Sequence, residues 1–141
     1  MGKNTKIVNK LRSSGLRPTK QRIQIANFLF DRDETFHFTV EELDHLINNK
    51  NSEEKISLAT FYNTIHAFKK AGHVKEILNN ENKKFFDTNT SSHHHFYDLK
   101  INKLIDIPKD RIAVNVPDAP QGKVIKDIDI IINIDNDNQN Q

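Results

Sequence analysis

The sequence contains no cysteine among its 141 residues. That absence excludes disulfide bonds, thiolate catalysis and every zinc or iron-sulfur site that needs cysteine ligands. Any metal bound by this chain must therefore use histidine, aspartate or glutamate.

Long apolar segments are absent as well. The N-terminal MGKNTKIVNK lacks the apolar core of a signal peptide, and no apolar run approaches the roughly 20 residues that span a bilayer. We therefore expect a soluble cytoplasmic protein with no membrane partner. With 35% hydrophobic residues a single core would be thin, which favours a homodimer that buries more apolar surface.

The net charge of +2 is distributed unevenly along the chain. Residues 1–80 carry +4 and residues 81–141 carry −2, and the first 30 residues hold seven basic side chains and no acidic one. A basic front half is typical of a protein that binds a polyanion such as DNA. On charge alone, an ordinary solvated face is an equally good interpretation.

Capping residues and apolar spacing predict four helices in the first half. The first covers residues 5–14, and the others follow Thr19, Thr39 and Ser57, which are good N-cap residues; Glu42 completes a capping box with Thr39. The fourth helix ends at Gly72. The side chains expected to face the core are Ile7, Val8, Leu11, Ile23, Ala26, Leu29, Phe30, Leu43, Leu46, Ile47, Leu58, Phe61, Ile65 and Phe68.

After Gly72 the pattern becomes that of strands. HVKEIL and KKFFDT, joined by NNEN, indicate a hairpin, and helices followed by such a hairpin are typical of a winged helix-turn-helix. HHHFYDL, LIDIP and VIKDIDIIINI predict three more strands, with a short helical or turn connection at 110–114 and the last strand paired across a dimer axis. We expect an α+β protein: a winged helix-turn-helix DNA-binding domain over 1–88, a small α/β dimerisation domain over 89–134, and a disordered tail over 135–141.

The outer face of the fourth helix carries side chains suited to reading DNA. An asparagine amide can bond adenine in bidentate fashion and a tyrosine ring can contact a thymine methyl, while nearby lysine and arginine hold phosphates. If they do not read DNA, Tyr62 and His66 would be packing residues and Asn63 merely solvated. The predicted DNA contacts are Arg17, Lys20, Arg22, Ser57, Thr60, Tyr62, Asn63 and His66.

Histidines and carboxylates suggest a metal site. Strand alternation places His93 and His95 on one face and His94 on the other, so the first two can converge on one metal ion. Asp87 and Asp106 can supply oxygen ligands, and His37 a further nitrogen. Such a set suits Fe(II), Mn(II) or Zn(II). The alternative is a solvent-exposed histidine run that binds metal incidentally.

Several of these motifs together resemble one family. GLRPTKQR, a histidine before TVEEL, ISLATFYNTI and KAGHVKEI look like the DNA-binding domain of the ferric uptake regulator family. FFDTNTSSHHHFY, LIDIP and DIIINI resemble its haem-responsive branch, the iron response regulators of alphaproteobacteria. The resemblance implies a dimeric transcription factor for iron and haem genes, not an enzyme.

The resemblance also assigns site residues. His37, Asp87, His93, His95 and Asp106 match the family's regulatory metal site, including a peroxide-sensing branch with aspartate at both carboxylate positions. It implies haem binding at His93, His94 and His95, with His94 facing outward as an axial ligand. Asp98 and Ile101 stand where most members have the first cysteine pair, so the structural zinc is not expected.

Two other functions remain open on the sequence. One is an iron, manganese or peroxide sensor of the same family that never binds haem. The other comes from a different class, because two histidines and a carboxylate can also form an Fe(II) oxygenase or hydrolase site. No cofactor-binding loop accompanies them, and the helix-turn-helix would then have no role.

Overall fold

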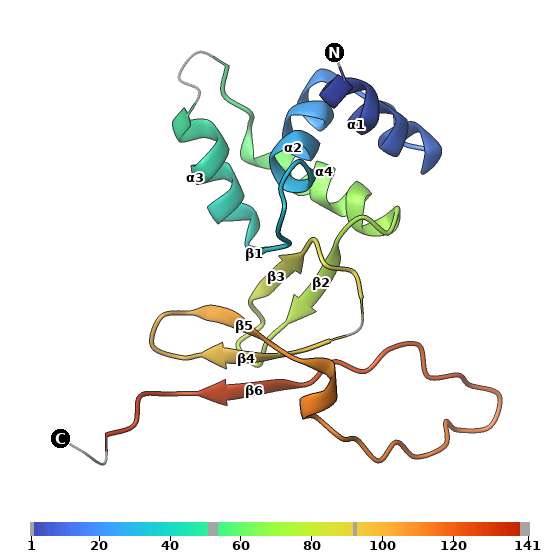
Figure 1. The fold of residues 1–141 in the computed structure, drawn as a ribbon, viewed down its shortest axis with the longest axis vertical. Helices are drawn as coiled ribbons and strands as arrows, with labels where there is room; N and C mark the ends of the chain where they lie inside the picture. The colour runs from blue at the N-terminus through green and yellow to red at the C-terminus, as the bar shows by residue number, and fades with distance from the viewer. Residues whose placement is uncertain (1, 51–53, 92, 139–141) are drawn as a thin grey trace. The chain divides into compact units, whose positions relative to one another are not determined.

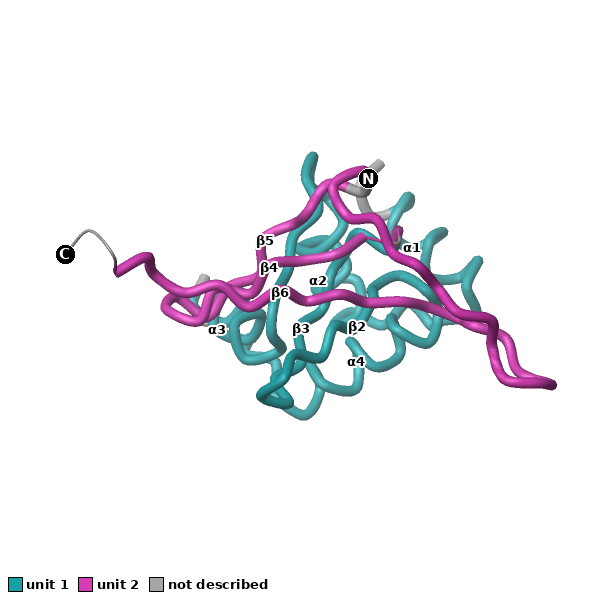
Figure 2. The backbone as a smooth tube through the Cα atoms, turned by 90° about the horizontal axis from the view of Figure 1, so that it is seen from below, with its two compact units in different colours: residues 1–90 teal, residues 91–141 magenta. Residues whose placement is uncertain are grey.

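A computed structural model describes residues 2–50, 54–91 and 93–138 of the chain (Figure 1). The chain divides into two compact units, residues 1–90 and residues 91–141 (Figure 2). The dividing point lies two residues after the expected boundary at residue 88. Of the expected tail, residues 139–141 lie outside the described residues, and residues 135–138 have no helix or strand.

The described part of the first unit consists of helices followed by short strands. Its elements are α1 (Gly2–Ser13), α2 (Lys20–Phe30), β1 (His37–Phe38), α3 (Val40–Lys50), α4 (Leu58–Lys70), β2 (Lys75–Leu78) and β3 (Lys84–Asp87). The predicted starts of α2, α3 and α4 are confirmed by their caps, whereas α1 begins at Gly2, earlier than the expected residue 5. The hydroxyl oxygens of Thr19, Thr39 and Ser57 accept the backbone N–H three residues ahead at 3.3, 3.1 and 3.1 Å.

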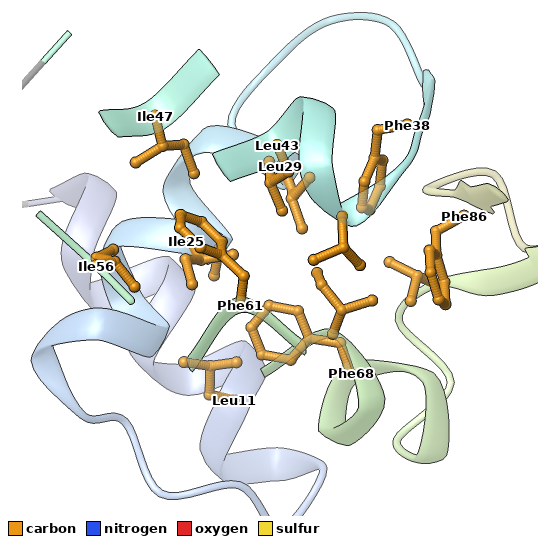
Figure 3. Close-up of a cluster of buried hydrophobic side chains, with 14 of the residues drawn as sticks. Leu11, Ile25, Leu29, Phe38, Leu43, Ile47, Ile56, Phe61, Phe68 and Phe86 are labelled. Carbon is orange, nitrogen blue, oxygen red and sulfur yellow. The ribbon is translucent and has the colours of Figure 1, made fainter. Parts of the chain in front are cut away.

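The helices of this unit pack around one apolar core. Figure 3 shows side chains from all four helices, from β1 and from β3 pointing toward one another. Burial of this apolar surface is the main stabilising contribution to the fold. The fully or almost fully buried members are Ile7, Leu11, Ile25, Ala26, Leu29, Phe38, Val40, Leu43, Ile47, Ile56, Phe61, Ile65, Phe68, Val74 and Phe86.

Two expectations about this core were wrong. Leu46 and Leu58 were expected to face inward, but they are 40% and 43% exposed. Leu58 is the first residue of α4, where no preceding turn covers it, and Leu46 lies at the edge of the stripe that Leu43 and Ile47 define. In α2 the fully buried position is Ile25, whereas Ile23 only packs against the core.

A three-stranded antiparallel sheet completes the first unit. Its order is β1-β3-β2, so β3 is central, and the predicted hairpin is formed by β2 and β3. The Asn79 side chain closes the hairpin turn, because its Oδ1 accepts the N–H groups of Glu81 and Lys83 at 3.0 and 2.9 Å. Asn82 takes the left-handed conformation with φ 60°, which asparagine tolerates better than most residues.

The second unit contains a sheet of order β5-β4-β6. The strands are β4 (His94–Asp98), β5 (Lys103–Ile107) and β6 (Ile131–Ile134); β5 pairs antiparallel with β4 and β6 pairs parallel with it. Asp98 closes the β4–β5 hairpin, because its Oδ1 accepts the N–H groups of Lys100 and Ile101. Tyr97, which is buried, donates its hydroxyl to Asn102 Oδ1 at 2.9 Å.

The last predicted strand is shorter than expected. A strand was predicted over 124–134, but only Ile131–Ile134 is a strand. The reason is the partner: β4 has five residues, and β6 pairs with His95 through Asp98, so β4 has no backbone left for residues 124–129. The connection expected at 110–114 is a short 3-10 turn, Lys109–Arg111. The mixed α+β fold is confirmed, although among the described residues of the second unit the helical part is this one turn.

Candidate metal centre and nucleic-acid interface

The first unit pairs a histidine with a buried carboxylate. His37 and Asp87 are register partners on β1 and β3, and His37 Nε2 lies 3.3 Å from Asp87 Oδ2. The Asp87 side chain is 1% exposed, and its Oδ1 accepts the N–H of Asn89 at 2.8 Å. Burying a carboxylate this completely requires a positively charged or hydrogen-bonding partner. A protonated imidazole or a metal ion meets that requirement.

The second unit gathers the other three predicted ligands. His95 and Asp106 are register partners on β4 and β5, and His93 comes just before β4. The Nε2 atoms of both histidines lie 3.2 Å from the same oxygen, Asp106 Oδ1. Both imidazoles are buried, with ring centroids 4.5 Å apart. Strand alternation therefore placed these two side chains correctly on one face.

A backbone hydrogen bond fixes which nitrogen of His93 can bind a metal. Its Nδ1 lies 2.9 Å from the carbonyl oxygen of Ser91. A carbonyl only accepts hydrogen bonds, so Nδ1 carries a proton, and a neutral imidazole held in this way has its lone pair on Nε2. Protein ligands to zinc and iron are commonly held in this way, with the far ring nitrogen donating to a carbonyl. The lone pair of His93 is thus directed to the side where His95 and Asp106 lie.

All five predicted ligands have the chemistry that a first-row divalent metal requires. The structure brings His37 together with Asp87 in one unit, and His93 together with His95 and Asp106 in the other. Nitrogen and carboxylate oxygen donors suit Fe(II), Mn(II) and Zn(II) alike. These residues therefore fit such a metal ion.

His94 has a different role from the one expected. It was predicted to face outward as a haem ligand, but its Nδ1 accepts the backbone N–H of Ile130 at 3.0 Å. A neutral imidazole that accepts at Nδ1 carries its proton on Nε2, so no lone pair is available to haem iron while this bond is kept. Nothing else in the arrangement of His93 and His95 supports haem.

The recognition face predicted on α4 is exposed. Tyr62, Asn63 and His66 point to solvent, whereas Phe61 and Ile65 are buried in the core. Thr60 is half-buried and the Ser57 hydroxyl serves as the helix cap. Neither Tyr62 nor His66 is a core packing residue, which removes the main alternative to a binding role.

The predicted phosphate contacts lie on and before α2. Arg17 is exposed and its carbonyl accepts a hydrogen bond from Arg22 Nη1 at 3.1 Å. Lys20 forms an ion pair with Glu54 at 2.9 Å, with both side chains mostly exposed. Exposed ion pairs of this kind contribute little free energy, so Lys20 can exchange Glu54 for a phosphate.

Sequence reasoning missed a group of charged residues beside α4. A cavity of about 600 Å³ opens between α3, α4 and the β2–β3 hairpin, and it is bounded by Tyr62, His66, Lys69, Lys83 and Lys84. Glu76 forms ion pairs with Lys69 at 3.2 Å and Lys84 at 4.0 Å. The sequence feature that could have revealed this group is the adjacent pair Lys83 and Lys84. A basic hairpin tip beside a recognition helix is suited to contact phosphates.

Comparison with known proteins identifies the family. Residues 13–134 match the ferric uptake regulator family. The chain belongs to this family. Its members are transcriptional regulators and not enzymes, so the oxygenase or hydrolase alternative has no support.

Individual relatives refine this placement. The peroxide-responsive repressor PerR of Staphylococcus epidermidis is 34% identical over 99 residues, which cover 70% of this chain and 63% of that protein. The chain therefore spans somewhat less than two thirds of that relative's length. The relatives found do not support the expected placement in the haem-responsive branch.

Solved structures agree on the fold. The ferric uptake regulator of Vibrio cholerae has a TM-score of 0.68 at 21% identity, with 91% of this chain and 98% of that one covered. A zinc-bound manganese uptake regulator has a TM-score of 0.64 at 23% identity, with 92% and 98% covered. Within the described residues, no helix is both long enough and apolar enough to cross a membrane.

Proposed function

We propose that this protein is a metal-responsive transcriptional regulator that binds operator DNA as a homodimer in the cytoplasm. A divalent metal ion is held by His37, Asp87, His93, His95 and Asp106. The observation that carries the proposal is the arrangement of His93, whose Nδ1 donates to a backbone carbonyl while its Nε2 is directed to Asp106. This is the arrangement of a ligand histidine rather than of a solvated one.

The charges of the ligand set explain why a cation belongs there. In the second unit two imidazole nitrogens each lie 3.2 Å from the same carboxylate oxygen. In the first unit Asp87 is almost completely buried. When bound, the metal ion supplies the positive charge that holds these groups together without protonating them. Ligand residues from both units would then couple metal binding to the arrangement of the units, and so to DNA affinity.

Apolar residues on the second unit support the dimer. Ile101, Ile105 and Ile132 are 58%, 44% and 41% exposed, and Val124 is 83% exposed. Phe96 pairs in register with both Ile105 and Ile132, so these three side chains share one face of the sheet. A contiguous apolar face of this kind is normally covered by a partner, and a second copy gives the two-fold symmetry that a palindromic operator requires.

DNA reading is assigned to α4. Asn63 and Tyr62 are presented to the bases, with Thr60 and His66 beside them on the same helix and Ser57 at its N-cap. Arg17, Lys20 and Arg22 contact phosphates on one side, and Lys69, Lys83 and Lys84 extend the basic surface on the other.

Among the finer functions, the relatives favour a peroxide or manganese and iron sensor over a haem sensor. A peroxide-responsive repressor is 34% identical to the chain, and both carboxylate ligands are aspartates, as in the peroxide-sensing branch. Peroxide sensing through iron-catalysed oxidation of a ligand histidine requires no cysteine. We expect peroxide to abolish operator binding of the Fe(II)-loaded protein and to leave the Mn(II)-loaded protein active.

The test of the metal site uses DNA selected by the wild-type protein from random duplexes in the presence of Mn(II). We expect His93→Ala and Asp106→Asn to lose both stoichiometric Mn(II) and most of the affinity for the selected duplex. His45→Ala is the matched control, because His45 is an exposed histidine of α3 outside the ligand set. If His93→Ala with no Mn(II) bound had the same affinity for the selected duplex as Mn(II)-loaded wild type, the proposal that metal binding controls DNA affinity would be wrong.

A further inference from the structure

A hydrogen bond ties the recognition helix to the helix before it. The Tyr62 hydroxyl on α4 donates to Glu41 Oε1 on α3. Both side chains are exposed, and Tyr62 keeps 46% of its surface open to solvent. The contact therefore lies on the outer surface of the first unit and contributes nothing to its apolar core.

The position of Glu41 in α3 favours its carboxylate as the hydrogen-bond acceptor for Tyr62. It lies in the first turn of α3, which Thr39 caps, and the N–H groups at a helix N-terminus favour a carboxylate there. The hydrogen bond to Glu41 is the largest cause that raises the pKa of Tyr62, with desolvation and the carboxylate charge adding to it. The hydroxyl therefore remains a protonated donor at neutral pH, and its one proton is directed to Glu41.

The Glu41–Tyr62 hydrogen bond lies beside α4, the helix proposed to read DNA. Glu41 and Tyr62 both line the 600 Å³ cavity beside α4, together with His66 and the basic side chains Lys69 and Lys84. The Tyr62 ring lies at the rim of this cavity, with its hydroxyl turned toward α3. Its ring then remains available to a base.

We propose that Glu41 is a positioning residue that presents Tyr62 to a thymine methyl group; this inference rests on the proposed DNA binding by α4. The carboxylate accepts the hydrogen bond that the hydroxyl donates, so Tyr62 reads the base with its ring and not with its hydroxyl. Fixing the side chain before binding also avoids the entropy loss of ordering it at the interface. Glu41 thereby contributes to specificity without touching DNA.

The test compares variants that separate the hydrogen bond from the charge. Glu41→Ala removes both, Glu41→Gln keeps an accepting oxygen without the charge, and Tyr62→Phe removes the donor. Glu42→Ala is the matched control, since it removes a charge from the same helix turn. Each full-length protein, loaded with Mn(II), is titrated with the duplex selected by wild type and with a scrambled duplex of the same composition.

We expect Glu41→Ala and Tyr62→Phe to lower the ratio of selected to scrambled affinity by about threefold to tenfold, the effect of freeing one side chain. Glu41→Gln and Glu42→Ala should keep the wild-type ratio, although the loss of a negative charge raises both affinities. Replacing thymine by uracil in the selected duplex should weaken wild type more than Glu41→Ala. An unchanged ratio in Glu41→Ala, or an equal loss in Glu42→Ala, would overturn the proposal.

A measurement on the free protein separates this inference from the proposed function. Spectrophotometric titration should show a lower Tyr62 pKa in Glu41→Ala than in wild type, since the hydrogen bond that raises it is gone. If that shift is seen but wild type selects no sequence, the contact exists and DNA reading by α4 is wrong, and the positioning role is wrong with it. If wild type selects a sequence but the pKa does not shift, only the Glu41 inference fails.

Discussion

Asn63 is the side chain of α4 with the most specific hydrogen-bonding capacity. It is exposed, and its amide offers both a donor and an acceptor, which match the edge of adenine in the major groove. We expect Asn63→Ala to weaken binding to the selected duplex by about 1 to 3 kcal/mol and to leave binding to scrambled DNA nearly intact. Fluorescence anisotropy at fixed salt measures both. Equal losses on the two duplexes would show that Asn63 does not read a base.

The sequence predicted the roles of single residues well where a side chain interacts with its close neighbours along the chain. Thr19, Thr39 and Ser57 cap helices as expected, because a hydroxyl beside the free N–H groups of a first turn has few competing options. The orientation of His94 could not be predicted in the same way. Its partner, the Ile130 amide, is 36 residues away, and only tertiary structure brings the two together.

The attachment of α1 to the end of α4 depends on His73. This histidine follows Gly72, its Nε2 lies 2.8 Å from Ser14 Oγ, and its ring packs against Phe30 and Phe68. Desolvation, with a smaller effect of the Lys10 charge, lowers the pKa of His73. The unfolded chain therefore binds a proton more readily than the folded one, so stability is lost as pH falls below about 6.5, the ordinary histidine pKa.

We expect wild type to lose stability between neutral pH and pH 5.5 more steeply than His73→Gln does. One group changes the unfolding equilibrium by at most about tenfold per pH unit, and part of that range is expected here. Urea unfolding at several pH values measures the difference between the two slopes. Parallel pH profiles for the two proteins would show that His73 does not contribute.

The strand β6 is held on β4 by side-chain as well as backbone hydrogen bonds. The Ile130 carbonyl accepts from the His95 N–H at 3.1 Å, and the Ile130 N–H donates to His94. We expect His94→Ala to speed hydrogen exchange at the Ile130 amide by about twofold to tenfold, as for the loss of one hydrogen bond. His94→Asn places an accepting oxygen near the Nδ1 position and should restore most of the protection. Equal exchange in the two variants would contradict this role.

The length of β6 could not be predicted from the pattern of apolar residues in the sequence. Alternating isoleucines from Ile128 to Ile134 predict a strand correctly, but they do not reveal how much backbone a partner can offer. The limit is set by the start of β4 at His94, because the parallel register pairs Ile131 with His95 and leaves no residue of β4 for the segment before Ile130.

The five proposed metal ligands could be named together from the sequence, because the residue types and the strand alternation at His93 and His95 are visible there. The detailed geometry of these residues could not be predicted, because the contacts with the Ser91 carbonyl and the shared Asp106 oxygen depend on the folded backbone.

The core of the first unit and the β4–β5 hairpin are formed by apolar packing and hydrogen bonds. We therefore expect a chelator to remove bound metal without unfolding the protein, as judged by unchanged far-ultraviolet circular dichroism. A loss of the helical signal would show that the metal is structural.

The Asp98 turn also bears on the proposed peroxide response. Where the family resemblance places a cysteine pair, a carboxylate and two backbone amides hold this turn together, and none of these groups reacts readily with peroxide. If the protein senses peroxide as proposed, this hairpin, which carries Asp106, keeps its shape while a ligand histidine is oxidised. The response and damage to the fold would then be chemically separate, and a molecule that has responded would remain a folded protein rather than a substrate for proteolysis.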